Sequence, residues 1–188
     1  MLNYFRGRMA RPASRRWNVL KTLAQTVVFW STFLFLIPAG ICALERAGGL
    51  EWRFDHPAAR WTGGTLFALG GLLGLTSGLV MAARGRGTPF PTDCARELVL
   101  TGPYRYIRNP MAVAGLSQGV AVGVFLGSPA VILYALFGGP IWHVFVRPWE
   151  EVDLEQRFGA PYRRYRAAVR CWLPRLTPYR DPGETSPS

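Results

Sequence analysis

Residues 111–146 read MAVAGLSQGVAVGVFLGSPAVILYALFGGPIWHVFV, and this run decides the fold. It holds 36 residues without a single Asp, Glu, Lys or Arg. A helix rises about 1.5 Å per residue, so this run is too long for one bilayer-spanning helix, which needs roughly 20 residues. Gly127, Ser128 and Pro129 form its break, because Gly and Pro together interrupt helices. The run therefore predicts two short spans joined as a hairpin.

Two further apolar stretches precede it, at residues 22–44 and 61–83. Each holds 23 residues without a charge, which is the length of a membrane span. The first is too long for the apolar core of a signal peptide, so we interpret it as a retained span. The sequence thus predicts an all-α integral membrane protein with four transmembrane helices, the last two forming a hairpin.

The net charge of +11 is concentrated in alternate segments between the spans. Basic residues crowd residues 1–21, the loop 84–110 and the tail after residue 146, whereas the loop 45–60 is balanced. This alternation obeys the positive-inside rule and predicts that both termini are cytoplasmic. It favours anionic lipid as the partner of the basic residues and argues against nucleic acid. A single lysine among 22 basic residues suggests a GC-rich genome, and we expect a bacterial inner membrane.

The chain divides by composition into four segments. These are a basic cytoplasmic arm (1–21), two N-terminal spans (22–83), a C-terminal region with two spans (84–176) and a flexible tail (177–188). Within the third segment, Tyr162, Tyr165 and Trp172 alternate with several arginines. This pattern predicts a cytoplasmic amphipathic helix with its aromatic side chains at the depth of the lipid headgroups.

Glycines recur every four residues at Gly70, Gly74 and Gly78, and again at Gly115, Gly119, Gly123 and Gly127. Small residues at this spacing let helices approach closely in lipid, and intrachain packing is the reading we favour. Room for a ligand beside the helix and a homodimer both stay open. Gly138, Gly139 and Pro140 predict a kink in the last span. The three cysteines lack CxxC spacing, so we expect no metal site.

Ionisable residues beside the last span are the first candidates for chemistry, because such groups are costly near lipid. Glu150 and Glu151 suit either a solvated helix end or attraction of a cation. Arg147 is either a snorkelling partner of Glu151 or a fork that holds a carboxylate or phosphate. His143 is a weaker candidate for a general base.

The loop GPYRYIRNPM, residues 102–111, supplies a second group of candidates. Gly102 and Pro103 predict a turn. Asn109 and Pro110 predict a helix start, because Asn is a strong N-cap and Pro is preferred at the first helical position. The backbone N–H groups of such a start suit a carboxylate or phosphate. Tyr104 and Tyr106 offer aromatic faces to a cation or a flat ring.

These residues together carry a resemblance. The pattern comprises Gly102-x-Tyr104-x-x-x-Arg108-Asn109-Pro110, Glu150-Glu151, Phe158-Gly159-x-x-Tyr162-x-x-Tyr165 and Leu173-Pro174. It resembles the isoprenylcysteine carboxyl methyltransferase family over residues 84–176, and related membrane phospholipid methyltransferases share its earlier parts. The resemblance implies an S-adenosylmethionine-dependent methyltransferase embedded in the membrane, acting on a lipophilic acceptor.

The resemblance also implies roles for single residues. The cofactor would be bound by Arg96, Glu97, Leu98, Val99, Tyr104, Asn109, Pro110, Met111, Ala112 and Glu150. Arg147, Glu151 and Arg108 would orient the acceptor, which is a prenyl-cysteine-like carboxylate or another isoprenoid or lipid. Asn109 stands where the family commonly has His, Ala112 where it often has Tyr, and Arg170 where it has Pro. These departures keep an alternative open, a noncatalytic membrane protein that retains the fold to bind a lipid or a partner.

Overall fold

The computed structural model describes residues 13–50, 52–86 and 95–182, and within these ranges all regular structure is helical. The described chain forms two compact units. Unit 1 contains residues 13–22, 76–110 and 145–182, and unit 2 contains residues 23–75 and 111–144. The flexible tail from residue 183 on, the first 12 residues of the basic arm and Cys94 lie outside the described residues. The division into four segments by composition stays a prediction.

The first helical run extends from Arg15 to Ala47 and is long and apolar enough to cross a membrane. It consists of α1 (Arg15–Trp30), a π-helical segment (Ser31–Leu36) and α2 (Ile37–Ala47). Helix α3 (Pro57–Arg84) is a second candidate span. The apolar helix α4 (Pro110–Leu126) is shorter, with 17 residues. The chain then continues into α5 (Pro129–Ile141), the third helical run with the length and composition of a span.

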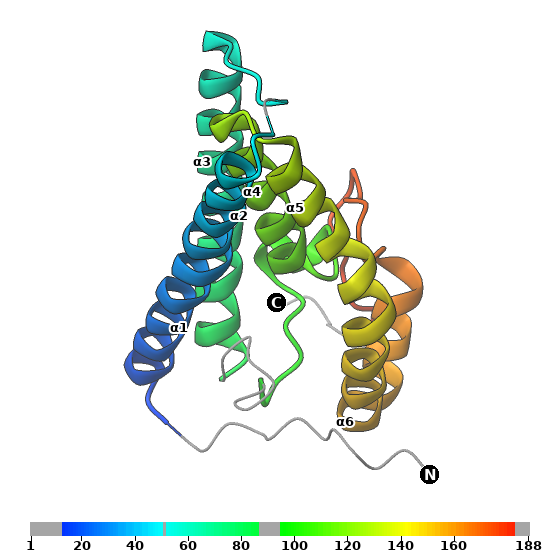
Figure 1. The fold of residues 1–188 in the computed structure, drawn as a ribbon. Coiled ribbons are helices and arrows are strands. Elements are labelled where there is room, and N and C mark those ends of the chain that lie inside the picture. Colours follow the sequence, from blue (N-terminus) through cyan, green and yellow to red (C-terminus); the bar gives the residue numbers. More distant parts are fainter. Residues whose placement is uncertain (1–12, 51, 87–94, 183–188) are drawn as a thin grey trace. The chain divides into compact units, whose positions relative to one another are not determined.

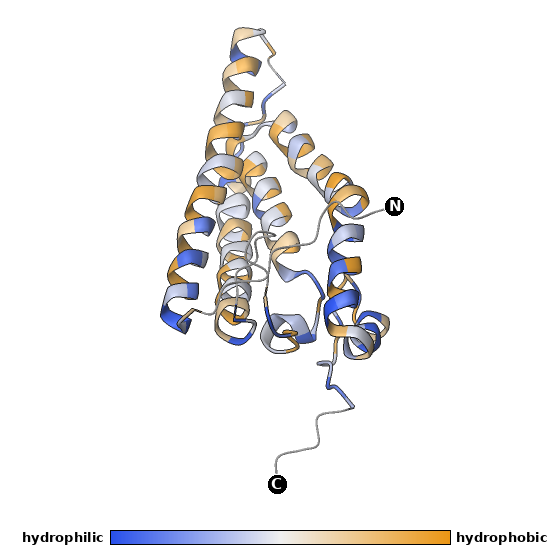
Figure 2. Cartoon of the chain, turned by 90° about the horizontal axis from the view of Figure 1, so that it is seen from below, coloured by the Kyte–Doolittle hydropathy of each residue, from blue (hydrophilic) through white to orange (hydrophobic). Residues whose placement is uncertain are grey.

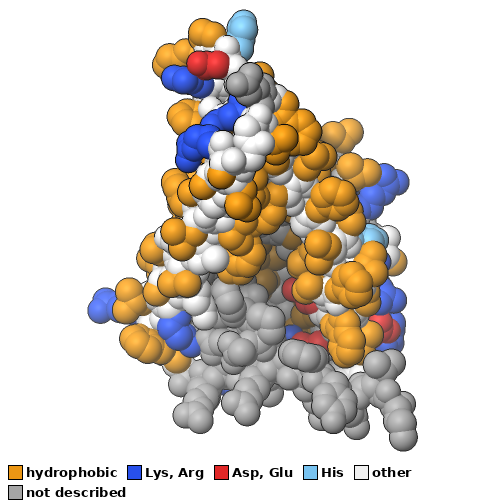
Figure 3. Space-filling view, viewed as in Figure 1, with side chains coloured by type: hydrophobic (Ala, Val, Ile, Leu, Met, Phe, Trp, Pro, Cys, Tyr) orange, Lys and Arg blue, Asp and Glu red, His pale blue; other side chains and the backbone are white. Residues whose placement is uncertain are grey.

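Large apolar side chains lie on the outside of these helices, where a soluble protein would place polar ones. Val28, Leu36, Leu69, Leu72 and Phe137 are all more than half exposed. Figure 2 shows hydrophobic residues spread along the helices, and Figure 3 shows them covering much of the visible face. An apolar surface of this extent is typical of a protein that is solvated by lipid. The predicted all-α membrane fold is confirmed.

The predicted break between the last two spans is also confirmed, because α4 ends at Leu126 and α5 begins at Pro129. The turn at Gly127 has a φ of +63°, and a Cβ there would lie 1.8 Å from the carbonyl oxygen of Phe54. Ser128 caps α5 by accepting a hydrogen bond from the Val131 N–H at 3.1 Å. Its hydroxyl lies 2.9 Å from each carboxylate oxygen of the buried Glu45. The loop before α3 and the α4–α5 turn therefore meet in unit 2.

The glycine stripes serve helix packing within unit 2. A Cβ on Gly63 would lie 2.7 Å from the Ala121 carbonyl oxygen, and one on Gly70 would lie 2.8 Å from the Gln118 side chain. Between α4 and α5, a Cβ on Gly119 would lie 2.9 Å from the Cβ of Ala135. Gly115 is different, since nothing lies within 4 Å of its Cβ position. Helix α2 lies beside α5 in the same unit (Figure 1).

The last span runs on into the polar C-terminal helix. A π-helical turn (Trp142–Val146) begins two residues after Pro140, where the sequence predicted a kink, and leads into α6 (Arg147–Ala168). The helix therefore continues through Pro148, which occupies its first turn, where a missing N–H costs little. At Gly159 the backbone leaves the helical region (φ 57°, ψ −130°), and the chain changes direction there (Figure 1).

Unit 1 has an aromatic core. Tyr162, Tyr165, Val169 and Tyr179 are buried together, and Leu98, Leu100, Leu154 and Phe158 pack against them. Helix α6 is amphipathic as predicted, with Arg163, Arg164 and Arg166 exposed. Tyr162 and Tyr165 are covered by protein, and their predicted depth at the lipid headgroups stays a prediction.

Candidate active site

The loop before α4 is fixed by a turn and by the C-terminal segment. Gly102 has a φ of +60° and opens a 3₁₀ turn (Gly102–Arg105), as the Gly-Pro pair predicted. Three backbone hydrogen bonds then join residues 105–108 to residues 170–179. The Arg108 N–H donates to the Arg170 carbonyl (3.0 Å), the Arg175 N–H to Tyr106 (2.9 Å) and the Tyr179 N–H to Arg105 (2.9 Å). This pairing determines where Arg108 and Asn109 lie.

Tyr104 lies inside unit 1 rather than on an open wall. Its hydroxyl donates to the Ser77 carbonyl at 3.4 Å, and its own carbonyl accepts a hydrogen bond from the Tyr165 hydroxyl at 2.6 Å. Burial above all raises the pKa of its phenol far above the ordinary value, with smaller contributions from Tyr165 and Glu150. Tyr104 is therefore a neutral side chain at any working pH. A direct contact of Tyr104 with a cofactor stays a prediction, and the structure shows a positioning role.

Two arginines from distant parts of the chain converge on one carboxylate. The Arg108 Nη1 atom lies 2.9 Å from the Glu151 Oε1 atom, and the Arg147 Nε atom lies 3.7 Å from the same oxygen. All three side chains are largely buried, with exposed fractions of 12% for Arg108, 27% for Arg147 and 17% for Glu151. The three residues predicted to orient the acceptor thus form one cluster in unit 1.

The neighbouring residues of the two motifs also meet. The Asn109 side-chain amide donates to the Glu150 carboxylate at 3.4 Å, and Glu150 lies at the surface of the unit. Helix α4 begins at Pro110, as the Asn-Pro pair predicted. Met111 and Ala112 form the first turn of α4 after Pro110 and belong to unit 2 with His143. Their predicted roles stay predictions.

The segment Arg96–Val99 belongs to unit 1 as well. The N–H groups of Arg96 and Glu97 both donate to the Gly85 carbonyl, at 2.6 and 3.1 Å. Val99 is buried and Leu98 packs against the aromatic core, so these two are anchors, whereas the side chains of Arg96 and Glu97 are exposed. Glu97 pairs with Arg86 at 3.0 Å.

Two supporting contacts escaped the sequence analysis. Arg157 pairs with Asp153 at 2.5 Å and also donates to the Ala95 carbonyl at 2.7 Å, which attaches the 95–99 segment to α6. The i, i+4 spacing of Asp153 and Arg157 is a signal that would have indicated this pair. No local pattern signals the Tyr165–Tyr104 hydrogen bond, which joins residues 61 positions apart.

The cluster contains buried N–H groups that make no hydrogen bond. Among the described residues, the Nε atoms of Arg108 and Arg147 are buried and have no hydrogen-bond acceptor, although the Arg147 Nε atom lies 3.7 Å from Glu151. A buried donor without a hydrogen bond costs about 1–3 kcal/mol, so an oxygen of a ligand would be favourable here. Guanidinium N–H groups suit a carboxylate or phosphate oxygen. No group of three His, Cys, Asp or Glu side chains within the described ranges is arranged to hold a metal ion.

Comparison with known protein families gives the class of this arrangement. The model of the phospholipid methyltransferase family matches residues 58–161, which is more than half of the chain. The chain belongs to the phospholipid methyltransferase family. The matched region runs from α3 into α6 and includes Arg108, Asn109, Glu150 and Glu151. No curated protein and no solved structure matches the chain.

Membership confirms the resemblance at the level of the family, since the two groups of membrane methyltransferases are related. The protein is therefore an integral membrane methyltransferase that acts on lipid. The Asn-Pro helix start and the Glu pair, two of the motifs that carried the resemblance, lie in contact within unit 1.

Proposed function

We propose that the protein transfers a methyl group from S-adenosylmethionine to a lipophilic acceptor, a prenyl-cysteine-like carboxylate or another isoprenoid or lipid. The observation that carries this proposal is the cluster of Arg108, Arg147 and Glu151, in which two buried guanidinium N–H groups make no hydrogen bond, beside the Asn109–Glu150 contact.

The chemistry of these residues fits the cofactor. S-adenosylmethionine carries a carboxylate, an ammonium group and ribose hydroxyls. The Nε groups that make no hydrogen bond and the start of α4 suit the carboxylate. Desolvation raises the pKa of the Glu150 carboxyl group to about 7, and its carboxylate form suits the cation or a hydroxyl pair. Asn109 holds that carboxylate by a neutral amide, so the replacement of the family's usual His preserves a donor at this position.

The cofactor supplies a methyl group already activated on a sulfonium, so the chain's own residues need to orient the reactants and exclude water. Arg108 would neutralise a carboxylate on the cofactor or on the acceptor. Arg147 and Glu151 would orient the acceptor, with Arg147 as the ligand of an acidic one. For an amine acceptor, Glu151 would receive the proton that the nitrogen loses, and His143 is the other candidate. The proline-flanked entry into α6 holds Arg147 and Glu151 on one helical turn.

The test measures thermal stability of the detergent-purified protein with S-adenosylmethionine and with S-adenosylhomocysteine. A ligand that binds only the folded state adds about 2.7 kcal/mol of stability at a hundredfold excess over its dissociation constant. We expect this increase in the wild type and its loss in Glu150→Gln. Glu155→Gln is the matched control, because Glu155 lies on the same helix and its ion pairs among the described residues are with Arg163 and Arg166.

An absence of any shift, in protein shown to be folded, would overturn the proposal. The family fold would then serve to bind a lipid or a partner without catalysis. If the cofactor binds, a screen of carboxylate and amine acceptors with tritiated methyl donor identifies the substrate class.

We also propose a bacterial inner membrane with both termini in the cytoplasm. Reporter fusions at residues 1 and 188 would test the orientation. A homodimer stays a prediction.

A further inference from the structure

A second polar site lies in unit 2, at the ends of the membrane spans. A cavity of about 200 Å³ is lined by the loop before α3, the first turn of α3 and the last turn of α4. It contains none of the residues proposed for methyl transfer. Because it lies between the candidate spans Arg15–Ala47 and Pro57–Arg84, it is located where lipid headgroups lie.

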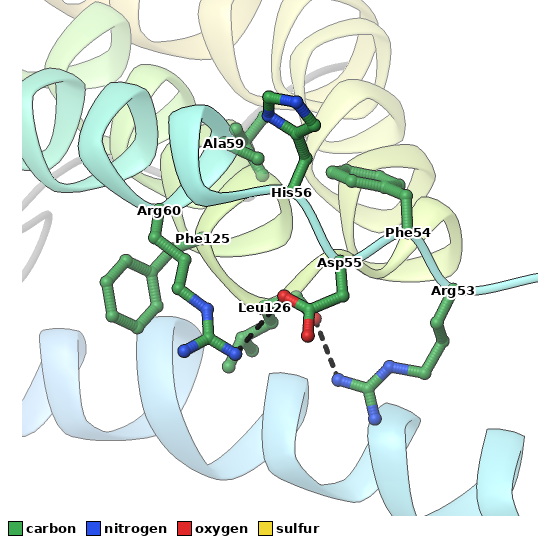
Figure 4. A pocket seen from close by; sticks show the side chains of 9 residues that line it. Arg53, Phe54, Asp55, His56, Ala59, Arg60, Phe125 and Leu126 are labelled. Atoms are coloured by element: carbon green, nitrogen blue, oxygen red, sulfur yellow. Dashed lines mark hydrogen bonds and ion pairs between the residues drawn. The ribbon is translucent and has the colours of Figure 1, made fainter.

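Residues 52–56 form a loop without regular secondary structure before α3. Figure 4 shows Arg53 and Asp55 pointing to one side together with Arg60, while the rings of Phe54 and His56 point away. His56 is occupied as a helix cap, since its Nδ1 atom accepts a hydrogen bond from the Ala58 N–H at 3.1 Å. The side that Arg53, Asp55 and Arg60 share is therefore the charged wall of the cavity.

The two arginines are only partly engaged by the protein. Arg53 donates through Nη2 to the Leu126 carbonyl at 2.7 Å, and Arg60 pairs with Asp55 at 3.2 Å. Among the described residues, no other acceptor is bonded to Arg53. Two guanidinium groups and one carboxylate leave a single net positive charge. That charge matches the single negative charge of a phosphodiester.

The surroundings of the charged wall are apolar and aromatic. Trp61 is 80% exposed and Phe125 is 50% exposed, on the helices that carry the cavity. Trp and other aromatic side chains at span ends mark the headgroup region of a bilayer. A ligand that places a phosphate on the arginines and hydrocarbon on these rings satisfies both features.

We propose that this cavity binds the phosphodiester headgroup of a membrane phospholipid, with the phosphate between Arg53 and Arg60. Asp55 competes with the phosphate for Arg60, so it limits the affinity and favours easy exchange with the bilayer. This site is separate from the acceptor site, and the proposal does not depend on methyl transfer.

The experiment titrates the full-length protein in detergent with dihexanoyl phosphatidylglycerol, a water-soluble phospholipid, and follows binding by native mass spectrometry. Charge-assisted hydrogen bonds contribute enough that Arg60→Gln should raise the dissociation constant about tenfold. Asp55→Asn should lower it, because the competing carboxylate is gone. Arg46→Gln, which removes an exposed arginine in the last turn of α2, should leave the dissociation constant unchanged.

The opposite signs protect the test from a general loss of structure. Asp55 and Arg60 have side chains 81% and 64% exposed, so neither substitution disturbs the core. Equal effects of Arg60→Gln and Arg46→Gln would overturn the proposal, as would weaker binding by Asp55→Asn. Binding of dihexanoyl glycerol, which lacks the phosphate, with the same affinity would overturn it too. Equally tight binding of inorganic phosphate would assign the cavity to free anions and refute the lipid assignment.

Discussion

Replacing Glu151 by Gln removes the carboxylate that joins Arg108 to Arg147. With an effective dielectric constant of about 20, each attraction amounts to about 6 kcal/mol at 2.9 Å and about 4–5 kcal/mol at 3.7 Å. Desolvation of the three groups offsets much of this. Removing one partner from a buried pair costs about 3–5 kcal/mol in practice, and the partial exposure here favours the lower end. We expect a loss of about 3 kcal/mol in the free energy of unfolding.

The substitutions on the two sides of the cluster are not equivalent. Arg108→Gln leaves Glu151 beside Arg147, so one ion pair survives. Glu151→Gln leaves two like charges without the carboxylate that both contact. The free energy of unfolding should therefore fall more for Glu151→Gln than for Arg108→Gln.

The assay is denaturant unfolding in mild detergent, followed by tyrosine and tryptophan fluorescence. Glu155→Gln is again the control, because Glu155 also lies between two arginines, at 2.9 and 3.8 Å, but these side chains are more exposed, at 31% for Glu155, 39% for Arg166 and 56% for Arg163. Exposed pairs contribute up to about 1 kcal/mol. Equal losses for Glu151→Gln and Glu155→Gln would refute the reasoning, because burial would then make no difference.

Three further predictions concern single contacts. Gly127→Ala should prevent stable folding, because it adds about 1–2 kcal/mol of backbone strain and places a Cβ 1.8 Å from the Phe54 carbonyl oxygen. Gly115→Ala should be tolerated, because nothing lies within 4 Å of its Cβ position, and thermal melting in detergent compares the two variants. Tyr165→Phe should cost about 1–3 kcal/mol in denaturant unfolding, because it leaves the buried Tyr104 carbonyl without its 2.6 Å donor, and Tyr106→Phe at the surface is the control. Burial raises the pKa of the Cys171 thiol. In a variant that carries Cys42→Ser and Cys94→Ser, Cys171 should therefore react with maleimide at pH 7 only after unfolding, and mass spectrometry would record the reaction.

The sequence predicted the features that depend on local pattern. Uncharged stretches of fixed length identified the spans, and Gly127 to Pro129 identified the hairpin turn, because these signals act within a few residues. The pairing of the Asn-Pro motif with the Glu pair followed from the family resemblance and not from spacing. The burial of Tyr104 and Tyr165 was not predicted, since their partners lie far away in the chain.

The continuity of the last helix could not be predicted from the sequence either. Pro148 left it open whether the last span joins α6, because a proline ends a helix in one context and begins one in another. In the structure the helix continues, because the π-helical turn Trp142–Val146 changes the hydrogen-bond register ahead of the N–H group that Pro148 lacks. A hydrophobic pattern with a period of 3.6 residues carries no information about such a turn.

The pairing of residues 105–108 with residues 170–179 has a consequence for biosynthesis. Residues 105–108 leave the ribosome before residues 170–179 are made, so the Arg108 N–H is exposed before its Arg170 acceptor exists. The arginine cluster can therefore reach its final geometry only after residue 179 has been translated. A nascent chain that stalls after α6 would contain the apolar helices yet lack the backbone partners of Arg105, Tyr106 and Arg108.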